Sequence, residues 1–467
     1  MADVSTGEIT RPQPTKLYRW MVLIWISLAM FGNYYVYDAL SPVADLLTSQ
    51  LHFTDSYIGL LQGIYSFPNI FTVVLGGLLI DRIGAKKSTF IFGVLCLLGS
   101  VITIIDPPQW LQTVAPTVAN LVSKPFGIFG TDVSEPLRIA LSNARFIVMA
   151  VGRLVFGMGA ESLIVAVTTL LAKWFRGKEL SFAFGINLTI ARLGSFAALN
   201  SPTWAKPAYA TWRGPFLIAM AICTLCVVGA VIYWGMENFA EKRFELGGGG
   251  KPDKIVWGDL FNFGVSYWYI VALCIVFYSG IFPFQTFAVK FFQEAHGTSR
   301  ELGGFLSSML TLFAMFATPL FGLLVDKVGK RALFMMFGSL LLIPVYLIMA
   351  YTHISLYLPM AMMGIAFSLI PAVMWPSVAY IVPESKLGTA YGVMTMIQNI
   401  GLFGFNILIG WENTHAGAGT ANPGGYHLGM WTFSILGLLG MTFAFLLRRR
   451  ELGPHGHGLE TIKASGK

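Results

Sequence analysis

The sequence predicts an all-α membrane protein in which twelve transmembrane helices form two six-helix halves. Three observations support this fold class: an apolar composition, recurring apolar runs of membrane-spanning length, and a motif that occurs twice. The 467 residues are 55% hydrophobic and only 12% charged, and the mean hydropathy is +0.67. A soluble fold of this length does not need so much apolar surface, so we expect lipid surroundings.

Twelve apolar runs are bounded by Gly, Pro and charged residues, and each is close to the roughly 20 residues that cross a hydrocarbon core. The first run is too long for the core of a signal peptide, so we interpret it as the first span. The predicted spans are 18–41, 57–80, 88–105, 145–172, 179–200 and 214–236, followed by 265–290, 303–325, 332–351, 355–381, 387–411 and 427–447.

The segments between the runs predict orientation and domain organisation. With a cytoplasmic N-terminus, 22 of the 31 Lys and Arg residues lie in the cytoplasm, seven lie outside, and Arg153 and Arg192 lie within spans. This bias follows the positive-inside rule and places both termini in the cytoplasm. The predicted parts are an N-terminal tail (1–17), a first half (18–236), a Gly-rich linker (237–264), a second half (265–447) and a C-terminal tail (448–467).

A repeated motif shows that the two halves are duplicated. The segment 77–87, GLLIDRIGAKK, recurs at 322–331 as GLLVDKVGKR, at an offset of 245 residues. Matching glycines later in each half have an offset of only 207 residues, so the first half contains 38 additional residues. We assign the surplus to the Pro-rich segment 106–144 and predict an outer insertion with a short interfacial helix.

The duplicated motif predicts a conformational role. Its glycines allow a tight turn, and Asp81 could cap the positive N-terminal end of a helix from the other half. Such a contact would hold one conformation of two rocking halves and break in the other. We therefore predict gating roles for Asp81, Arg82, Asp326 and Lys327, although the basic residues also set the topology.

The fourth predicted span contains Arg153 shortly before Gly157 and Gly159. Closely spaced glycines in a membrane helix are typical of close helix packing. Arg153 lies near the outer end of the span and could partly snorkel. We include Arg153 among the predicted gating residues.

Two charged residues lie near the middle of spans, Glu161 in the fourth and Arg192 in the fifth. A charge at the bilayer centre costs at least about 2.5–3.5 kcal/mol, so it faces a partner or an aqueous cavity. One interpretation is a structural Glu161–Arg192 ion pair, and the other is a pair of charges that bind the two ends of a zwitterion. The repeat aligns Ser368 with Glu161 and Asn399 with Arg192, and this asymmetry favours a substrate role.

Polar and aromatic residues in other spans complete the predicted substrate site. Tyr34 and Tyr37 lie in the first span, where tyrosines also serve as interfacial anchors. Trp375 precedes Pro376, and a proline within a span is tolerated beside a cavity. The predicted substrate-binding residues are Glu161, Arg192, Trp375, Tyr34, Tyr37, Asn399 and Gln398.

Other classes of function lack their sequence signatures. The four cysteines lie inside apolar runs, and no His cluster, Ser/His/Asp constellation or metal-ligand spacing occurs, so we predict no catalytic residue, disulfide, metal or cofactor. The formal charge of +8 is spread over short clusters between spans, which does not indicate nucleic-acid binding.

The duplicated motif and the Arg-Gly segment of the fourth span resemble motifs A and B of the major facilitator superfamily. Segments 159–163, 173–180, 191–195, 282–284, 374–376 and 382–392, in both halves, further resemble its lysosomal dipeptide transporters. The resemblance implies uniport of dipeptides by alternating access, with Glu161 toward the peptide ammonium and Arg192 toward the carboxylate. An alternative is a proton-coupled transporter of organic anions or lysolipids.

This sequence departs from the family pattern in two places. The insertion at 106–144 is longer than we expect for the corresponding segment in the family, and the tails carry no acidic-dileucine sorting signal. We therefore predict a bacterial inner membrane rather than a lysosome, and a protein that functions as a monomer without a partner subunit.

Overall fold

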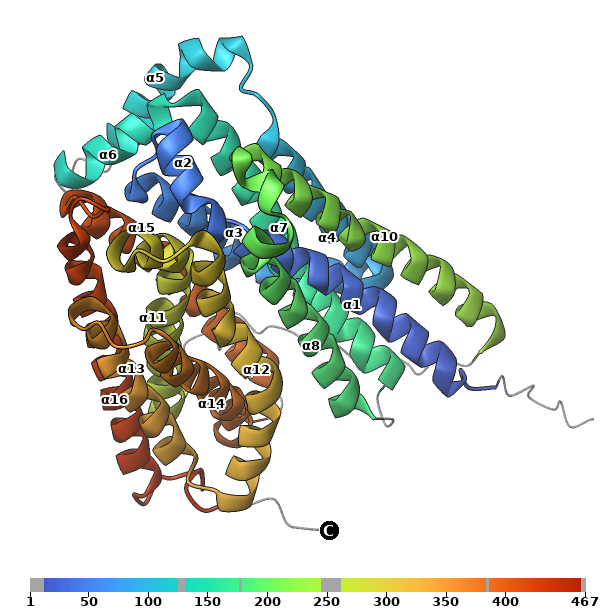
Figure 1. Cartoon of the computed structure of the whole chain (residues 1–467). Coiled ribbons are helices and arrows are strands. Elements are labelled where there is room, and N and C mark those ends of the chain that lie inside the picture. The colour runs from blue at the N-terminus through green and yellow to red at the C-terminus, as the bar shows by residue number, and fades with distance from the viewer. Residues whose placement is uncertain (1–11, 125–130, 176–178, 245–261, 384–385, 463–467) are drawn as a thin grey trace, which may run out of the picture.

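The computed structural model describes residues 12–124, 131–175, 179–244, 262–383 and 386–462. This part of the chain is helical, and twelve of its helices are long and apolar enough to cross a membrane. The predicted fold class is therefore confirmed. Figure 1 shows the helices as two bundles that lie side by side.

The spanning helices lie close to the predicted spans. Several extend beyond the apolar run, because helices continue into the polar layers on either side of a hydrocarbon core. In the first half they are α1 (Lys16–Asp38), α3 (Asp55–Ile83), α4 (Ala85–Ile104), α7 (Ala144–Phe175), α8 (Leu180–Leu199) and α10 (Arg213–Arg243). In the second half they are α11 (Val265–His296), α12 (Arg300–Val328), α13 (Arg331–Tyr351), α14 (Tyr357–Ile381), α15 (Leu387–His415) and α16 (His427–Glu451).

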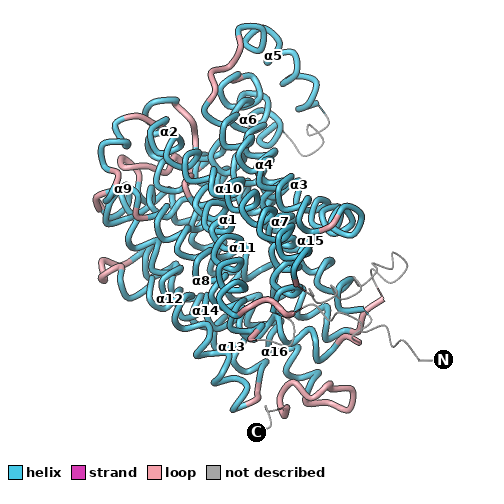
Figure 2. Tube along the Cα trace, turned by 90° about the vertical axis from the view of Figure 1, so that its right-hand side faces the viewer, coloured by secondary structure: helices cyan, strands magenta, loops and turns pink. Residues whose placement is uncertain are grey.

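The helix α1 begins and α16 ends at the same end of the molecule, which we call the termini end (Figures 1 and 2). The opposite end, which we call the insertion end, carries α5 (Gln109–Ser123) and α6 (Thr131–Ser142). The insertion thus contains two helices where one was expected. Most of the predicted linker (237–264) lies outside the described residues. Its first part is helical and not a flexible linker, because α10 continues to Arg243.

Asp106 anchors the start of the insertion to the first half. Arg145 of α7 and Arg213 of α10 both donate to its carboxylate. The hydrogen bond from Arg145, and after it the one from Arg213, hold the pKa of the Asp106 carboxyl below its ordinary value. The clamp joins the insertion to two spanning helices.

Glycines allow the helices of the first half to pack closely, as predicted for the fourth span. A methyl group on Gly157 would lie 2.3 Å from the carbonyl oxygen of Tyr65 in α3, and one on Gly159 would lie 2.6 Å from that of Phe92 in α4. The motif glycines Gly84 and Gly329 have φ of 87° and 75°, a conformation that L side chains rarely adopt, at the turns between helices.

The two halves are in contact at the insertion end and diverge toward the termini end (Figure 1). Gly59 of α3 and Gly304 of α12 let helices of opposite halves meet, because a methyl group on either would lie 2.2 Å from a carbonyl oxygen of the other half. Ser41, in the short helix η1 (Ser41–Val43), donates to the carbonyl oxygen of Gln285 at 2.6 Å. The insertion end is therefore closed.

Candidate functional site

A cavity of about 290 Å³ lies between the two halves. It is bounded by α1, α3, α7 and α8 of the first half and by α11, α14 and α15 of the second. Its lining comprises Asn33, Tyr34, Tyr37, Asp38, Tyr65, Val73, Glu161, Ile164, Val165, Arg192, Tyr278, Phe282, Trp375, Thr395, Gln398 and Leu402.

The charged lining residues come from three helices of the first half. They are Asp38 of α1, Glu161 of α7 and Arg192 of α8. The second half contributes aromatic, amide, hydroxyl and aliphatic side chains to the same lining. The cavity thus has one charged side and one neutral side.

Glu161 is held by a tyrosine of α3. The hydroxyl of Tyr65 donates to Oε1 of Glu161 at 3.1 Å. The Tyr65 ring in turn lies 5.4 Å from the guanidinium of Arg153. Arg153 donates to Gln62 and, at 3.3 Å, to the carbonyl oxygen of Val36, so it joins α7 to α3 and α1 behind the cavity wall.

Arg192 lies between two aromatic rings from opposite halves. Its guanidinium carbon is 5.5 Å from the centre of the Tyr34 ring and 5.0 Å from that of the Phe367 ring. Within the described chain no ion pair joins Arg192 to Glu161 or to another carboxylate. The structural ion pair considered from the sequence is absent here, and both charges remain available to a ligand.

Hydrogen-bonded aromatic residues form the opposite side of the cavity. The Trp375 indole N–H donates to the Tyr278 hydroxyl at 2.9 Å, and the Tyr391 hydroxyl donates to the carbonyl oxygen of Trp375 at 3.0 Å. The Tyr278 and Phe282 rings stack, with centroids 5.6 Å apart. These contacts hold broad apolar faces against the cavity.

The structure brings six of the seven predicted substrate-binding residues to the cavity: Glu161, Arg192, Trp375, Tyr34, Tyr37 and Gln398. Asn399 does not line it, because its amide donates to the carbonyl oxygen of Thr395 within α15 and its side chain is buried.

Ten lining residues are missing from the predicted set, among them the charged Asp38 and the aromatic Tyr65, Tyr278 and Phe282. The cost of burying a charge could have indicated Asp38, since it lies inside the first predicted span. The three aromatic residues carry no comparable signal, because aromatic side chains are frequent throughout the spans.

The predicted gating residues make no contact between halves among the side chains that the structure describes. Asp326 binds Arg331 of its own half at 2.9 Å, and Arg82 and Lys327 are exposed. Arg153 lies inside the first half. The side chain of Asp81 is outside the described part.

The described residues contain no group of three or more His, Cys, Asp or Glu side chains placed to hold a metal ion. What the cavity offers a ligand is therefore its separated charges and aromatic faces.

Comparison with known proteins gives one family. The model of the Major Facilitator Superfamily matches residues 26–404 and 284–464. The lysosomal dipeptide transporter MFSD1 of Danio rerio is 31% identical over 84% of this chain and 80% of its own length. The human MFSD1 is 30% identical over 85% of this chain and 80% of its own length.

Solved structures support the same fold. A bacterial homolog of the human lysosomal transporter Spinster, crystallised in an inward-facing and unoccupied conformation, matches with a TM-score of 0.68 and 17% identity. The match covers 93% of this chain and 98% of the other. At this identity the likeness concerns the fold alone.

Proposed function

Because the chain belongs to the major facilitator superfamily, we propose that it carries dipeptides or similar small zwitterionic peptides across a membrane by alternating access, as a uniporter. The observation that carries this proposal is the presence of Glu161 and Arg192 in one cavity without an ion pair between them. The two relatives described above, each about 30% identical over more than four fifths of this chain, are dipeptide transporters by name, which supports the same substrate class.

The two ends of a peptide are the groups that these charges would bind. A guanidinium offers a planar fork of N–H donors that matches a carboxylate, so Arg192 would bind the C-terminal end. Glu161 would accept hydrogen bonds from the terminal ammonium, and Asp38 adds a second carboxylate on the same side. Both ends are then recognised by the first half.

The neutral side of the cavity would accept the peptide side chains. Trp375, Tyr278 and Phe282 offer apolar faces, and Thr395 and Gln398 offer uncharged hydrogen-bonding groups. Because no residue type is selected strongly by such a wall, peptides of varied sequence would fit, while the charged ends set the orientation.

The charge of the substrate supports uniport. A zwitterion adds no net charge to the cavity, so its binding to Glu161 and Arg192 does not require an accompanying proton. We further propose that the termini end faces the cytoplasm, because 22 of the 31 Lys and Arg residues belong to that side.

Thermal stabilisation of the purified protein tests the substrate class, because a ligand that binds only the folded state raises its melting temperature. The panel contains dipeptides, single amino acids, organic anions and lysolipids. We expect stabilisation by several dipeptides and its loss in Glu161→Gln and Arg192→Ala. Glu412→Gln is the matched control, since Glu412 is a buried carboxylate that binds Thr432 and does not line the cavity.

A second candidate is the proton-coupled transport of organic anions or lysolipids. The observation that favours it is the position of Arg192, whose guanidinium lies near two aromatic rings. An anion that has no ammonium group could also bind this guanidinium. Stabilisation by anions or lysolipids alone, sensitive to Arg192→Ala but not to Glu161→Gln, would replace the dipeptide proposal.

A further inference from the structure

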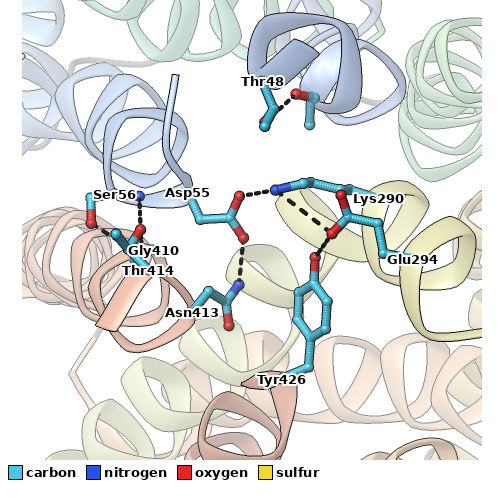
Figure 3. Close-up of polar contacts among 10 residues, drawn as sticks. Thr48, Asp55, Ser56, Lys290, Glu294, Gly410, Asn413, Thr414 and Tyr426 are labelled. Carbon is cyan, nitrogen blue, oxygen red and sulfur yellow. Dashed lines mark hydrogen bonds and ion pairs between the residues drawn. The ribbon is translucent and has the colours of Figure 1, made fainter. Parts of the chain in front are cut away.

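A buried ion pair joins the two halves at the insertion end. Lys290 of α11 donates to Oδ1 of Asp55, the first residue of α3, and each side chain is only 3% exposed (Figure 3). Asn413 of α15 donates to the other carboxylate oxygen at 3.0 Å. Asp55 is thus bound by two residues of the opposite half.

Among the described residues, two other ion pairs cross between the halves at this end. Asp45 and Arg300 are 21% and 22% exposed, and Lys206 and Glu301 are 77% and 29% exposed at 2.8 Å. Exposed pairs contribute little because water replaces the lost partner. A buried charge without a partner is far more costly. The Asp55–Lys290 pair is therefore the ionic contact that most opposes opening.

Lys290 has a second carboxylate within reach on its own helix. Oε2 of Glu294, one turn later in α11, lies 3.8 Å from Nζ of Lys290. The hydroxyl of Tyr426, at the end of the short helix η6 (Pro423–Tyr426), donates to the same oxygen. Glu294 and Tyr426 lie near Lys290 in Figure 3 and belong to the same half, so they move with it.

We propose that Lys290 exchanges its counter-ion during transport: it pairs with Asp55 while the insertion end is closed and with Glu294 when that end opens. This inference rests on the alternating-access part of the proposed function. Opening then carries Asp55 into water, where the positive end of α3 still stabilises its charge. Lys290 keeps a partner throughout, so the buried pair does not lock the carrier shut.

The exchange predicts opposite effects for two carboxylates that bind one lysine. Asp55→Asn removes the partner used in the closed state and therefore favours opening. Glu294→Gln removes the partner used in the open state and therefore favours closure. A lysine held only for the stability of the fold would respond to both substitutions in the same direction.

We call the Asp55–Lys290 pair the gate. Alkylation of a cysteine that lies between this gate and the cavity measures how often the insertion end opens. Ser41→Cys suits this purpose, because Ser41 is 4% exposed and lines a small space with Gln285 and Tyr37 between the gate and the cavity. The four native cysteines are completely buried. A membrane-impermeant maleimide is added to intact cells from the side that the insertion faces, and the rate is compared at constant pH.

We expect Asp55→Asn to accelerate alkylation about tenfold or more, since it leaves Lys290 without its closed-state partner. Glu294→Gln should slow it about threefold, as suits a partly exposed pair. Glu412→Gln, a buried carboxylate on α15 that does not contact Lys290, should leave the rate unchanged. In a Lys290→Gln background, Glu294→Gln should have no further effect. Melting temperatures establish that each variant is folded.

The outcomes separate this inference from the proposed function. Two results would overturn the exchange and leave the transport proposal intact. One is faster alkylation in Glu294→Gln, and the other is that Glu294→Gln changes the alkylation rate as much in the Lys290→Gln background as it does alone. If the reagent reaches Ser41→Cys in no variant, Asp55→Asn included, then this end does not open and the alternating-access proposal itself fails.

Discussion

The hydroxyl of Tyr65 donates to Glu161 at 3.1 Å, and this contact orients the carboxylate that faces the cavity. Tyr65 belongs to α3 and Glu161 to α7, so the contact depends on how two helices pack. The cation of Arg153 against the Tyr65 ring supports the same arrangement from behind.

Tyr65→Phe should weaken dipeptide binding. A hydrogen bond to a charged group contributes about 1.5–3 kcal/mol, part of which the bound ammonium replaces, so we expect a loss of affinity of about threefold to tenfold. Titration calorimetry measures it. Tyr57→Phe is the control, because Tyr57 lies on the same helix and makes aromatic contacts away from the cavity. Tighter binding in Tyr65→Phe would mean that Tyr65 competes with the substrate for Glu161.

Arg192→Lys should also reduce affinity, although it keeps the positive charge. Lysine loses the planar fork that matches a carboxylate and the stacking between Tyr34 and Phe367, for which we expect a loss of about tenfold. Binding is compared for a dipeptide and for the same dipeptide with an amidated C-terminus. An equal loss for both ligands would show that Arg192 does not bind the carboxylate.

Gly410→Ala should open the insertion end. Its methyl group would lie 2.4 Å from the carbonyl oxygen of Asp55, and backbone cannot yield as a flexible side chain can. The distance between spin labels at Ser49 and Thr420, exposed residues of opposite halves, should therefore increase. Gly392→Ala is the control, because Gly392 lies on the same helix as Gly410 and a methyl group there would meet nothing within 4 Å. Equal distances in both variants would show that α3 and α15 accommodate the methyl group.

The Asp106 clamp should make stability depend on pH. Because folding lowers the pKa of Asp106, the ionised carboxyl stabilises the protein above its ordinary pKa of about 3.9, and this contribution is lost as the pH falls through the lowered value. The melting temperature of Asp106→Asn should be below that of the unmodified protein at about pH 6, and the difference should shrink toward about pH 3. A difference that is independent of pH would contradict the ionic role.

Much of the fold could be predicted because its signals are local. Apolar runs report which segments lie in lipid, and the repeated motif around Asp81 and Asp326 reports the duplication. The charges of Glu161 and Arg192 are visible in the sequence for the same reason, since each is costly in lipid wherever its helix faces.

The sequence did not predict which side of each helix faces the cavity. Gln398 and Asn399 are adjacent and both polar, yet only Gln398 lines the cavity, because successive residues of a helix point about 100° apart. Arg153, for which a gating role stays a prediction, binds Gln62 inside one half, and hydropathy does not report such a contact.

The sequence by itself determined which segments span the membrane, that the halves are duplicated and which charges must be accommodated there. Only the tertiary structure decided which of those charges meet. Asp55 and Lys290 are 235 residues apart in the sequence. Each lies near the end of its predicted span, where a charged residue is common and does not by itself indicate a partner. Their pairing arises from the approach of α3 and α11 across the two halves, and hydropathy encodes depth in the membrane but not which neighbour a helix face will meet.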